Sequence, residues 1–283
     1  MSTIIVATKH CKDFPLVVAA NIDGIISDPG APQGINKTPT IFGAKSKNGS
    51  VKCAINEASL FAAITDQGSS PGKKKTDKIV LEALKCGSLK ELVSFVEDFN
   101  PAKYQPFNLV FGNKEQVYLA HSFILHSMVI KPLAVGVNVI TDNIKFTGAN
   151  VKAHYIHNSL NNIEGLPWIE YYAHLKLLLA KGGKVKIKYP LEQERKTGTV
   201  SSCVMAFSDS GLARYKYYNR VAERNDKEPR YNDYVDEWRK ECGSPTNILD
   251  TTSEHTDTIK ILSSVNMHEL TDIKINAKTD HIS

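Results

Sequence analysis

Apolar and β-branched residues gather in short runs that predict two pairs of strands before any helix. The runs Thr3 to Thr8 and Pro15 to Asn21 are almost continuously apolar, and a short polar connection separates them. Such runs predict a hairpin whose strands are covered on both faces. Ser50 to Ile55 and Ser59 to Thr65 predict a second pair around a turn. Between the pairs, Asp28 to Gly34 is rich in Pro and Gly and predicts a loop.

The pattern then changes to the period of helices. Thr76 to Lys85 and Ser88 to Phe99 each carry an apolar helical face, and Ser88 with Glu91 matches a capping box. The remaining patterns predict strands at 107–111, 116–121, 133–140, 184–188, 199–207, 212–218 and 258–262, and helices at 149–162, 168–180 and 234–240. This order of strands and helices favours a layered α+β fold over a regular βαβ alternation. We expect a single domain over 1–283, with a polar C-terminal extension from about residue 221.

Composition and charge exclude several classes of protein. The 283 residues are 42% apolar and 23% charged, which is typical of a globular chain. Lys and Arg exceed Asp and Glu by 35 − 30 = 5, too little to indicate a nucleic-acid partner without a concentrated patch. No apolar run approaches the ~18 residues of a transmembrane segment. Five cysteines without CxxC spacing and a start without a secretory signal favour a cytoplasmic protein.

Three possible ligand motifs have simpler interpretations. Gly68 to Lys74 lacks one spacer residue and the Ser or Thr of a phosphate loop. His154 and His157 share a predicted helix face, but two imidazoles alone are an incomplete metal site. Tyr215 to Tyr218 mixes aromatic and basic residues as nucleic-acid-binding sheets do, yet its alternation suits ordinary sheet packing. We therefore predict no cofactor, no metal and no nucleic-acid partner.

The start of the chain carries the most informative chemistry. Removal of Met1 leaves Ser2 with a free α-amine, and an N-terminal Ser can attack with its own amine as the base. The amine suits this role because its unperturbed pKa is ~7.7–8.0. Asp23 ends the second strand of the predicted hairpin, which returns it to Ser2. We expect this carboxylate to orient the amine.

The segment Leu16-Val-Val-Ala-Ala-Asn21-Ile22-Asp23 resembles the signature of the NRDE family, also called the Transport and Golgi organization protein 2 family. Further landmarks of that family fall in order along the chain. They are Ser27-Asp28-Pro29, Gly49-Ser50 with Ala62 to Asp66, Phe107-Asn108-Leu109-Val110, Pro167-Trp168 and Thr197-Gly198-Thr199. The resemblance spans roughly residues 2 to 220 and lies in the order of these short motifs.

The resemblance implies a fold and a reaction. The family is similar to the choloylglycine-hydrolase and penicillin-acylase-like N-terminal nucleophile hydrolases, which implies a four-layer αββα sandwich. The implied reaction cleaves or transfers an acyl group of a small amide or acyl substrate. Ser2 would attack, Asp23 would hold the amine, Asn21 would fix the local loop, and donors near the other residues would stabilise the oxyanion. The site residues implied in this way are Ser2, Asn21, Asp23, Asp66, Asn138 and Asn143.

The sequence departs from the family pattern at five of its positions. Ser2 replaces the usual Cys, Ile22 the signature Arg, Gly24 its Glu, Asp66 the expected oxyanion Asn, and Val200 a later Arg. An ionised Asp accepts hydrogen bonds and cannot donate them. Losing one oxyanion donor costs ~3–4 kcal/mol of barrier height. Either backbone amides supply the donor, or an Asp is protonated, or hydrolysis is lost.

Two further hypotheses follow from these departures. Asp23, Asp66 and Asp142 would form an acidic pocket for a cationic group or a divalent metal. The alternative to an amidohydrolase or acyltransferase is a non-catalytic protein on the same scaffold that binds or carries haem or an acyl lipid, a role that the resemblance also implies.

Overall fold

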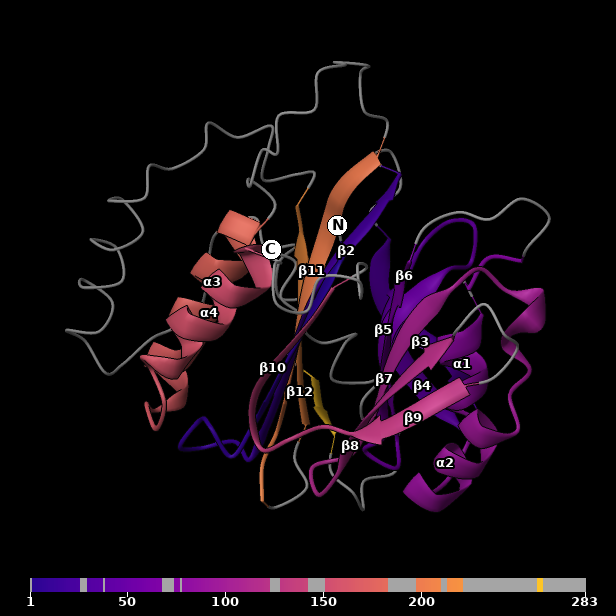
Figure 1. Cartoon of the computed structure of the whole chain (residues 1–283), viewed down its shortest axis with the longest axis horizontal. Helices are drawn as coiled ribbons and strands as arrows, with labels where there is room; N and C mark the ends of the chain where they lie inside the picture. Colours follow the sequence, from indigo (N-terminus) through magenta and orange to yellow (C-terminus); the bar gives the residue numbers. More distant parts are fainter. Residues whose placement is uncertain are drawn as a thin grey trace, which may run out of the picture.

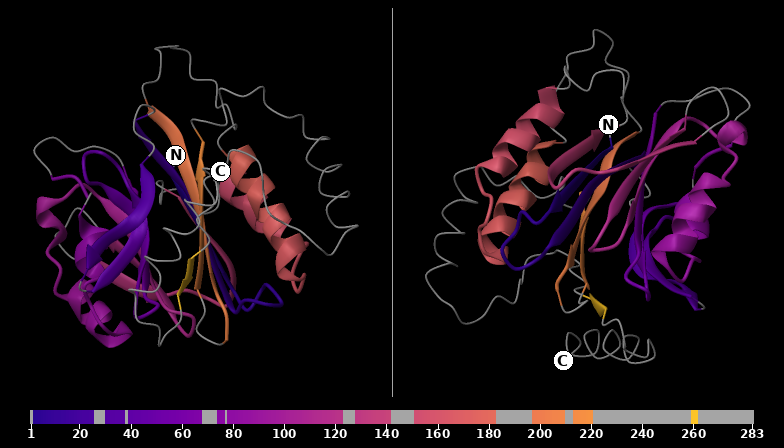
Figure 2. Two further views of the ribbon diagram at one scale, coloured as in Figure 1. Left: turned by 180° about the vertical axis from the view of Figure 1, so that it is seen from behind. Right: turned by 60° about the horizontal axis from the view of Figure 1, so that its bottom comes forward.

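Two antiparallel sheets lie face to face, and a pair of helices covers the outer face of each sheet (Figure 1). The computed structural model describes residues 2–25, 30–37, 39–67, 74–76, 78–122, 128–141, 151–182, 197–209, 213–220 and 259–261. The layers run helices, sheet, sheet, helices, so the predicted layered α+β sandwich is confirmed (Figure 2). The predicted single domain over 1–283 stays a prediction, because most residues after 220 lie outside the described ranges.

The first sheet has β1 and β2 in its interior and takes its other strands from later in the chain. Its order is β10 (Gly136–Thr141), β1 (Thr3–Thr8), β2 (Leu16–Ile25), β11 (Thr197–Phe207), β12 (Ala213–Asn219) and β13 (Ile259–Ile261). Helices α3 (Val151–Asn161) and α4 (Trp168–Gly182) cover its outer face.

The second sheet is a meander whose strands follow one another in sequence. Its order is β3 (Ala31–Lys37), β4 (Thr40–Lys45), β5 (Val51–Asn56), β6 (Phe61–Asp66), β7 (Phe107–Gly112), β8 (Val117–Ser122) and β9 (Met128–Pro132). Helices α1 (Ile79–Ala83) and α2 (Leu89–Glu97) cover its outer face, with the short 3-10 helix η1 (Pro101–Lys103) after them. Ser88 caps α2 by accepting a hydrogen bond from the Glu91 amide, as the capping box predicts.

The continuous apolar run of β1 is explained by cores on both of its faces. Ile4 and Val6 pack between the two sheets, against residues such as Phe61. Ile5 and Ala7 point the other way and pack under α3 and α4. Because successive side chains of a strand alternate between its faces, a strand covered twice needs apolar residues at every position.

The second sheet buries its other face in the same way. Ala62 and Ile64 of β6 pack with Val80 of α1 and Leu92 of α2, whereas Ala63 faces the core between the sheets. Within the ranges that the structure describes, no helix is both long enough and apolar enough to cross a bilayer.

Several elements differ from the sequence-based predictions. The loop predicted over Asp28 to Gly34 is wrong from Ala31 onward, where β3 begins. This strand is at the edge of its sheet, the position at which a strand tolerates Pro and Gly. The short strands β4 and β9 were not predicted, because one contains Gly43 and the other ends in Pro132. The strand predicted at 184–188 and the helix at 234–240 lie outside the described residues.

Tyr215 and Tyr217 pack in the core between the sheets, while Tyr218 of the same strand lies in the core under α4. Lys216 is also on that outer side, with its ammonium 4.4 Å from the ring centroid of Tyr172. The alternating aromatic and basic run is therefore ordinary sheet packing.

The two histidines considered as a metal-binding pair, His154 and His157, lie on the surface of α3. Each contacts an Asn one turn later in the helix, Asn158 and Asn161 respectively.

His10 makes the stability of the fold sensitive to acid. Its side chain is 2% exposed and packs edge-on against Tyr171. Burial, the largest effect, lowers the pKa of His10, which Glu164 partly opposes. The unfolded chain therefore binds a proton more readily, and the free energy of unfolding is expected to fall as the pH drops below about 6.5. The slope from this one group is at most about 1.4 kcal/mol per pH unit.

Urea unfolding between pH 7.5 and pH 5 measures this slope. His10→Leu is expected to flatten it, since leucine does not titrate. Equal slopes for the unsubstituted chain and His10→Leu would contradict the assignment.

Candidate active site

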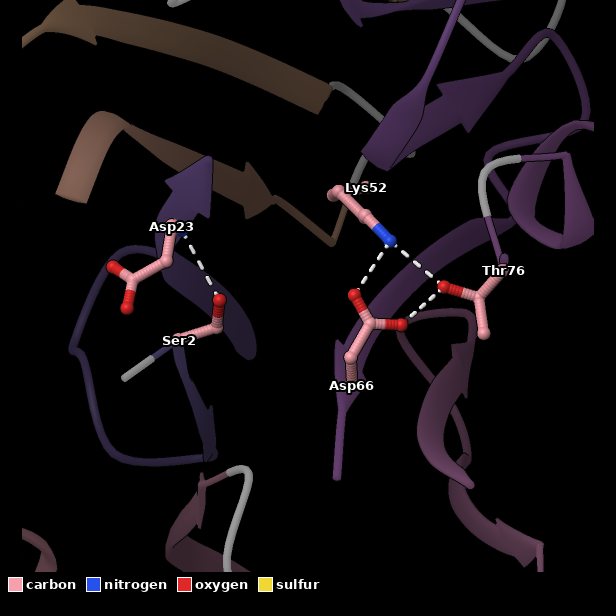
Figure 3. Close-up of polar contacts among 5 residues, drawn as sticks. All are labelled: Ser2, Asp23, Lys52, Asp66 and Thr76. Carbon is pink, nitrogen blue, oxygen red and sulfur yellow. Dashed lines mark hydrogen bonds and ion pairs between the residues drawn. The ribbon is translucent and has the colours of Figure 1, made fainter. Parts of the chain in front are cut away.

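The hairpin of β1 and β2 brings Ser2 and Asp23 together, as the sequence predicts. Ser2 directly precedes β1, and the register pairs Thr3 with Asn21, so the two strands meet at this end of the sheet. The backbone N–H of Asp23 donates to the Ser2 hydroxyl oxygen at 3.1 Å (Figure 3). Ser2 is half-buried, and strand alternation places its side chain on the same side as Ile4, toward the second sheet.

The Asp23 carboxylate is held by a hydroxyl from the neighbouring strand. Thr199 of β11 donates through Oγ1 to Asp23 Oδ1 at 2.8 Å, and Thr199 is only 8% exposed. The β2–β11 register shifts between Thr199 and Ser201, a bulge that allows Thr199 to pair with Asp23. Two strands therefore determine the position of the Asp23 side chain.

Asn21 anchors β2 to the helical layer rather than contacting Ser2. Its Nδ2 donates to the carbonyl oxygen of Leu179 in α4 at 2.9 Å, and its Oδ1 accepts from the Ser202 hydroxyl at 2.5 Å. The Ser202 oxygen in turn accepts from Arg220 Nε at 2.7 Å. Asn21 and Ser202 are both at least 98% buried. Their hydrogen bonds therefore hold β2 against α4 on the outer side of the first sheet. These bonds anchor β2 to α4 and β11, while a role of Asn21 in fixing the loop at the site stays a prediction.

Asp66 does not face Ser2. It pairs across the sheet with Phe107, whose ring lies in the core under α1 and α2. Lys52 Nζ donates to Asp66 Oδ2 at 2.9 Å and to Thr76 Oγ1 at 2.7 Å, and the Thr76 hydroxyl donates to Asp66 Oδ1. Figure 3 shows this carboxylate directed toward Lys52 and Thr76, with no contact to Ser2 drawn. Its charge is matched by the ammonium of Lys52, whose side chain is only 15% exposed.

Of the two predicted asparagines in and after β10, the structure describes one. Asn138 pairs with Val6 in the middle of β1, and its Nδ2 donates to the carbonyl oxygens of Ala134 at 2.7 Å and Gly136 at 3.4 Å. Its amide thus bonds to the backbone where β10 begins. Gly136 there pairs with Thr8, at the end of β1 that is far from Ser2. Asn143 lies outside the described residues.

The acidic pocket suggested by the sequence does not gather from Asp23 and Asp66, because their carboxylates bond to different strands and point apart (Figure 3). Asp142 falls in a range that the structure does not describe. Among the described residues, no three His, Cys, Asp or Glu side chains lie close enough to hold a metal ion.

A polar row on the inner face of the second sheet was missed by the sequence analysis. Thr65, Asn108 and His121 pair directly across β6, β7 and β8. Asn108 Oδ1 lies 2.7 Å from Gln67 Nε2 and 2.7 Å from His121 Nδ1. Its Nδ2 donates to Thr65 Oγ1 at 3.3 Å and to the carbonyl oxygen of Thr141 at 2.9 Å. A buried Asn between the apolar residues of β7 is the one sequence signal for this row.

The protonation of His121 follows from its partner. An amide oxygen can only accept, so the Nδ1 that faces Asn108 carries the hydrogen. Burial and, to a smaller extent, the positive charge of Lys131 lower the pKa of His121. The imidazole is therefore neutral at pH 7 and donates to Asn108 without adding charge to this face.

The solved structures whose fold matches this chain include two hydrolases. The penicillin V acylase of Agrobacterium tumefaciens has a TM-score of 0.53 and 14% sequence identity, with 77% of this chain and 86% of that chain covered. A variant of the conjugated bile acid hydrolase of Clostridium perfringens has a TM-score of 0.50 and 10% identity, with 94% and 99% covered. This chain has the fold of these two hydrolases. The N-terminal nucleophile hydrolase fold implied by the sequence resemblance is thereby supported.

No family model matches the sequence, and no curated protein matches it. Membership of the NRDE family therefore stays a prediction. At 10% and 14% identity the two structural matches establish the fold alone.

Proposed function

We propose that the chain is an amidohydrolase or acyltransferase of N-terminal nucleophile type, with Ser2 as the nucleophile. The observation that carries the proposal is the 3.1 Å hydrogen bond from the Asp23 N–H to the Ser2 hydroxyl oxygen, beside a carboxylate that Thr199 holds in place. The shared fold with an acylase and a bile acid hydrolase supports a reaction on an amide bond.

The mechanism uses groups at one end of the hairpin. Once Met1 is removed, the α-amine of Ser2 takes the hydroxyl proton while the oxygen attacks the substrate carbonyl. The Asp23 N–H holds the Ser2 oxygen in position. The negative charge develops on the substrate carbonyl oxygen, and the nearby Asp23 carboxylate stabilises the resulting ammonium. The ammonium then protonates the leaving amine, and an acyl ester remains on Ser2. Water completes a hydrolysis, whereas an acceptor amine completes a transfer.

The side chain next to the nucleophile suits an apolar acyl group. Ile22 stands where the resembled family has Arg, and it packs against the core between the sheets. An aliphatic side chain here supplies contact area and no charge, so a neutral acyl group is favoured over an anionic one at this position.

Acylation of the native protein tests the proposal. The intact mass of the purified chain is expected to lack Met1, and incubation with p-nitrophenyl acetate is expected to add one acetyl group that peptide mapping locates on Ser2. Urea-unfolded protein is the control, because the hairpin geometry is then lost. Retention of Met1, or acetylation elsewhere only, would contradict the proposal.

The non-catalytic carrier stays the alternative prediction. A protein that purifies with haem or an acyl lipid, and whose Ser2 resists the activated ester, would favour that alternative.

A further inference from the structure

The polar row of the second sheet lies opposite the start of β1. Asn108 Nδ2 donates at 2.9 Å to the carbonyl oxygen of Thr141, and Thr141 pairs with Thr3 across the β10–β1 ladder. Thr3 follows Ser2 directly, and paired residues of antiparallel strands lie only about 5 Å apart. Asn108 therefore joins the second sheet to the first at the end where Ser2 lies.

Gln67 extends this row toward the end of β6. Its backbone N–H donates to the Pro106 carbonyl oxygen at 2.8 Å, which fixes the main chain just after the strand. Its side-chain Nε2 donates to Asn108 Oδ1 at 2.7 Å, so the carboxamide lies on the inner face with Asn108. Because Asn108 Oδ1 also accepts from His121 Nδ1, the acceptor is itself held from the opposite side.

A carboxamide nitrogen carries two hydrogens, and Asn108 takes only one of those on Gln67. Asp66, the preceding residue, is an acceptor whose carboxylate bonds to Lys52 and Thr76 on the other face of the sheet. The Asp66 side chain is thus on the outer face of the second sheet, whereas the Gln67 side chain is on the inner face, toward the first sheet and Ser2. Of these two neighbours, only Gln67 has a side-chain donor on that inner face.

We infer that the second Nε2–H of Gln67 is the side-chain donor to the oxyanion formed when Ser2 attacks, with Asn108 and His121 as its positioning residues. The inference rests on the proposed function. It assigns the donor that the sequence left open when Asp66 appeared at the expected oxyanion position. The assignment has the oxyanion form between the sheets, next to Ser2 of the first sheet, with its side-chain donor on the inner face of the second sheet.

Acylation rates of matched variants test this role. With p-nitrophenyl acetate, Gln67→Ala is expected to acylate Ser2 roughly 100-fold more slowly, the loss typical of one oxyanion donor. The loss should fall on the acylation rate constant and leave KM nearly unchanged, because the donor acts mainly in the transition state. Gln67→Glu should lose at least as much, since a carboxylate has no hydrogen to donate. Asp66→Asn, one residue away on the other face, is the control and should stay within about threefold.

Binding of a boronic acid gives a readout that needs no turnover. An alkylboronic acid forms a tetrahedral anionic adduct on a serine oxygen and so imitates the oxyanion. Gln67→Ala is expected to weaken this adduct as strongly as it slows acylation, whereas a purely structural role would lower the thermal midpoint without that selective loss. An unchanged acylation rate and boronate affinity in Gln67→Ala, with Ser2 still acylated, would overturn the Gln67 role alone. Failure of the unsubstituted chain to be acylated would overturn the proposed function and this role with it.

Discussion

Replacing Ser2 by alanine is expected to abolish acylation of the protein by p-nitrophenyl acetate and to lower any amide turnover by roughly 10⁴- to 10⁶-fold, the range for loss of a catalytic nucleophile. The reason is that Ser2, once Met1 is removed, combines a hydroxyl that accepts from the Asp23 N–H with an α-amine on the same residue. Stopped-flow release of p-nitrophenolate and intact mass measure the two effects.

Two matched variants make this result specific. Ser2→Cys keeps a nucleophile at the same atom and is expected to be acylated at least as readily, because a thiol ionises far more easily than a hydroxyl. Thr3→Ser changes the adjacent residue, whose side chain is on the other face of β1, and is expected to leave the rate near that of the unsubstituted chain. Full activity in Ser2→Ala would remove Ser2 from the mechanism.

The second large effect is expected at Asn21, and it concerns stability. Asn21→Ala removes the side-chain donor to the Leu179 carbonyl and the acceptor of the Ser202 O–H, and it disturbs the bond that the Ser202 oxygen accepts from the 7% exposed Arg220. Unsatisfied buried groups cost about 1–3 kcal/mol each, so the free energy of unfolding should fall by about 3–4 kcal/mol. Urea denaturation followed by circular dichroism measures this loss.

A double-mutant cycle separates the energy of the Asn21–Ser202 hydrogen bond from the cost of the cavity that a truncated side chain leaves. Ser202→Ala is expected to be destabilising by itself, and the double variant should lose less than the sum of the two single losses. Additive losses would mean that Asn21 and Ser202 act independently. A loss below about 1 kcal/mol in Asn21→Ala would show that α4 does not depend on this bond.

The hairpin at the start of the chain was predictable from sequence because its information is local. Two apolar runs, the first from Thr3 to Thr8, are separated by a short polar connection. This pattern predicts both strands and their burial on both faces of the sheet. Asp23 is then brought to Ser2 by strand pairing alone. The resemblance to N-terminal nucleophile hydrolases added the order of layers, which the local pattern does not contain.

The second sheet was harder to predict because its polar side chains take their roles from distant partners. Whether Asp66 faces Ser2 depends on which face of β6 meets the first sheet, and on Lys52 and Thr76 being near enough to bind the carboxylate. The sequence shows an Asp where an Asn is expected, but not the direction in which it points. Likewise, Asn108 bonds to residues of β6 and β8 in its own sheet, and its bond to Thr141 of β10 forms only when both sheets are assembled.

The interior place of β1 has a consequence for the order in which the molecule is made. One neighbour of β1, β2, is synthesised almost at once, but the other, β10, ends at Thr141, and the hydroxyl that steadies Asp23 comes from Thr199. Closing such long loops is slow relative to local pairing. Ser2 and Asp23 of a ribosome-bound chain are therefore synthesised well before the strands that complete their surroundings, so this end of the hairpin takes its final form late.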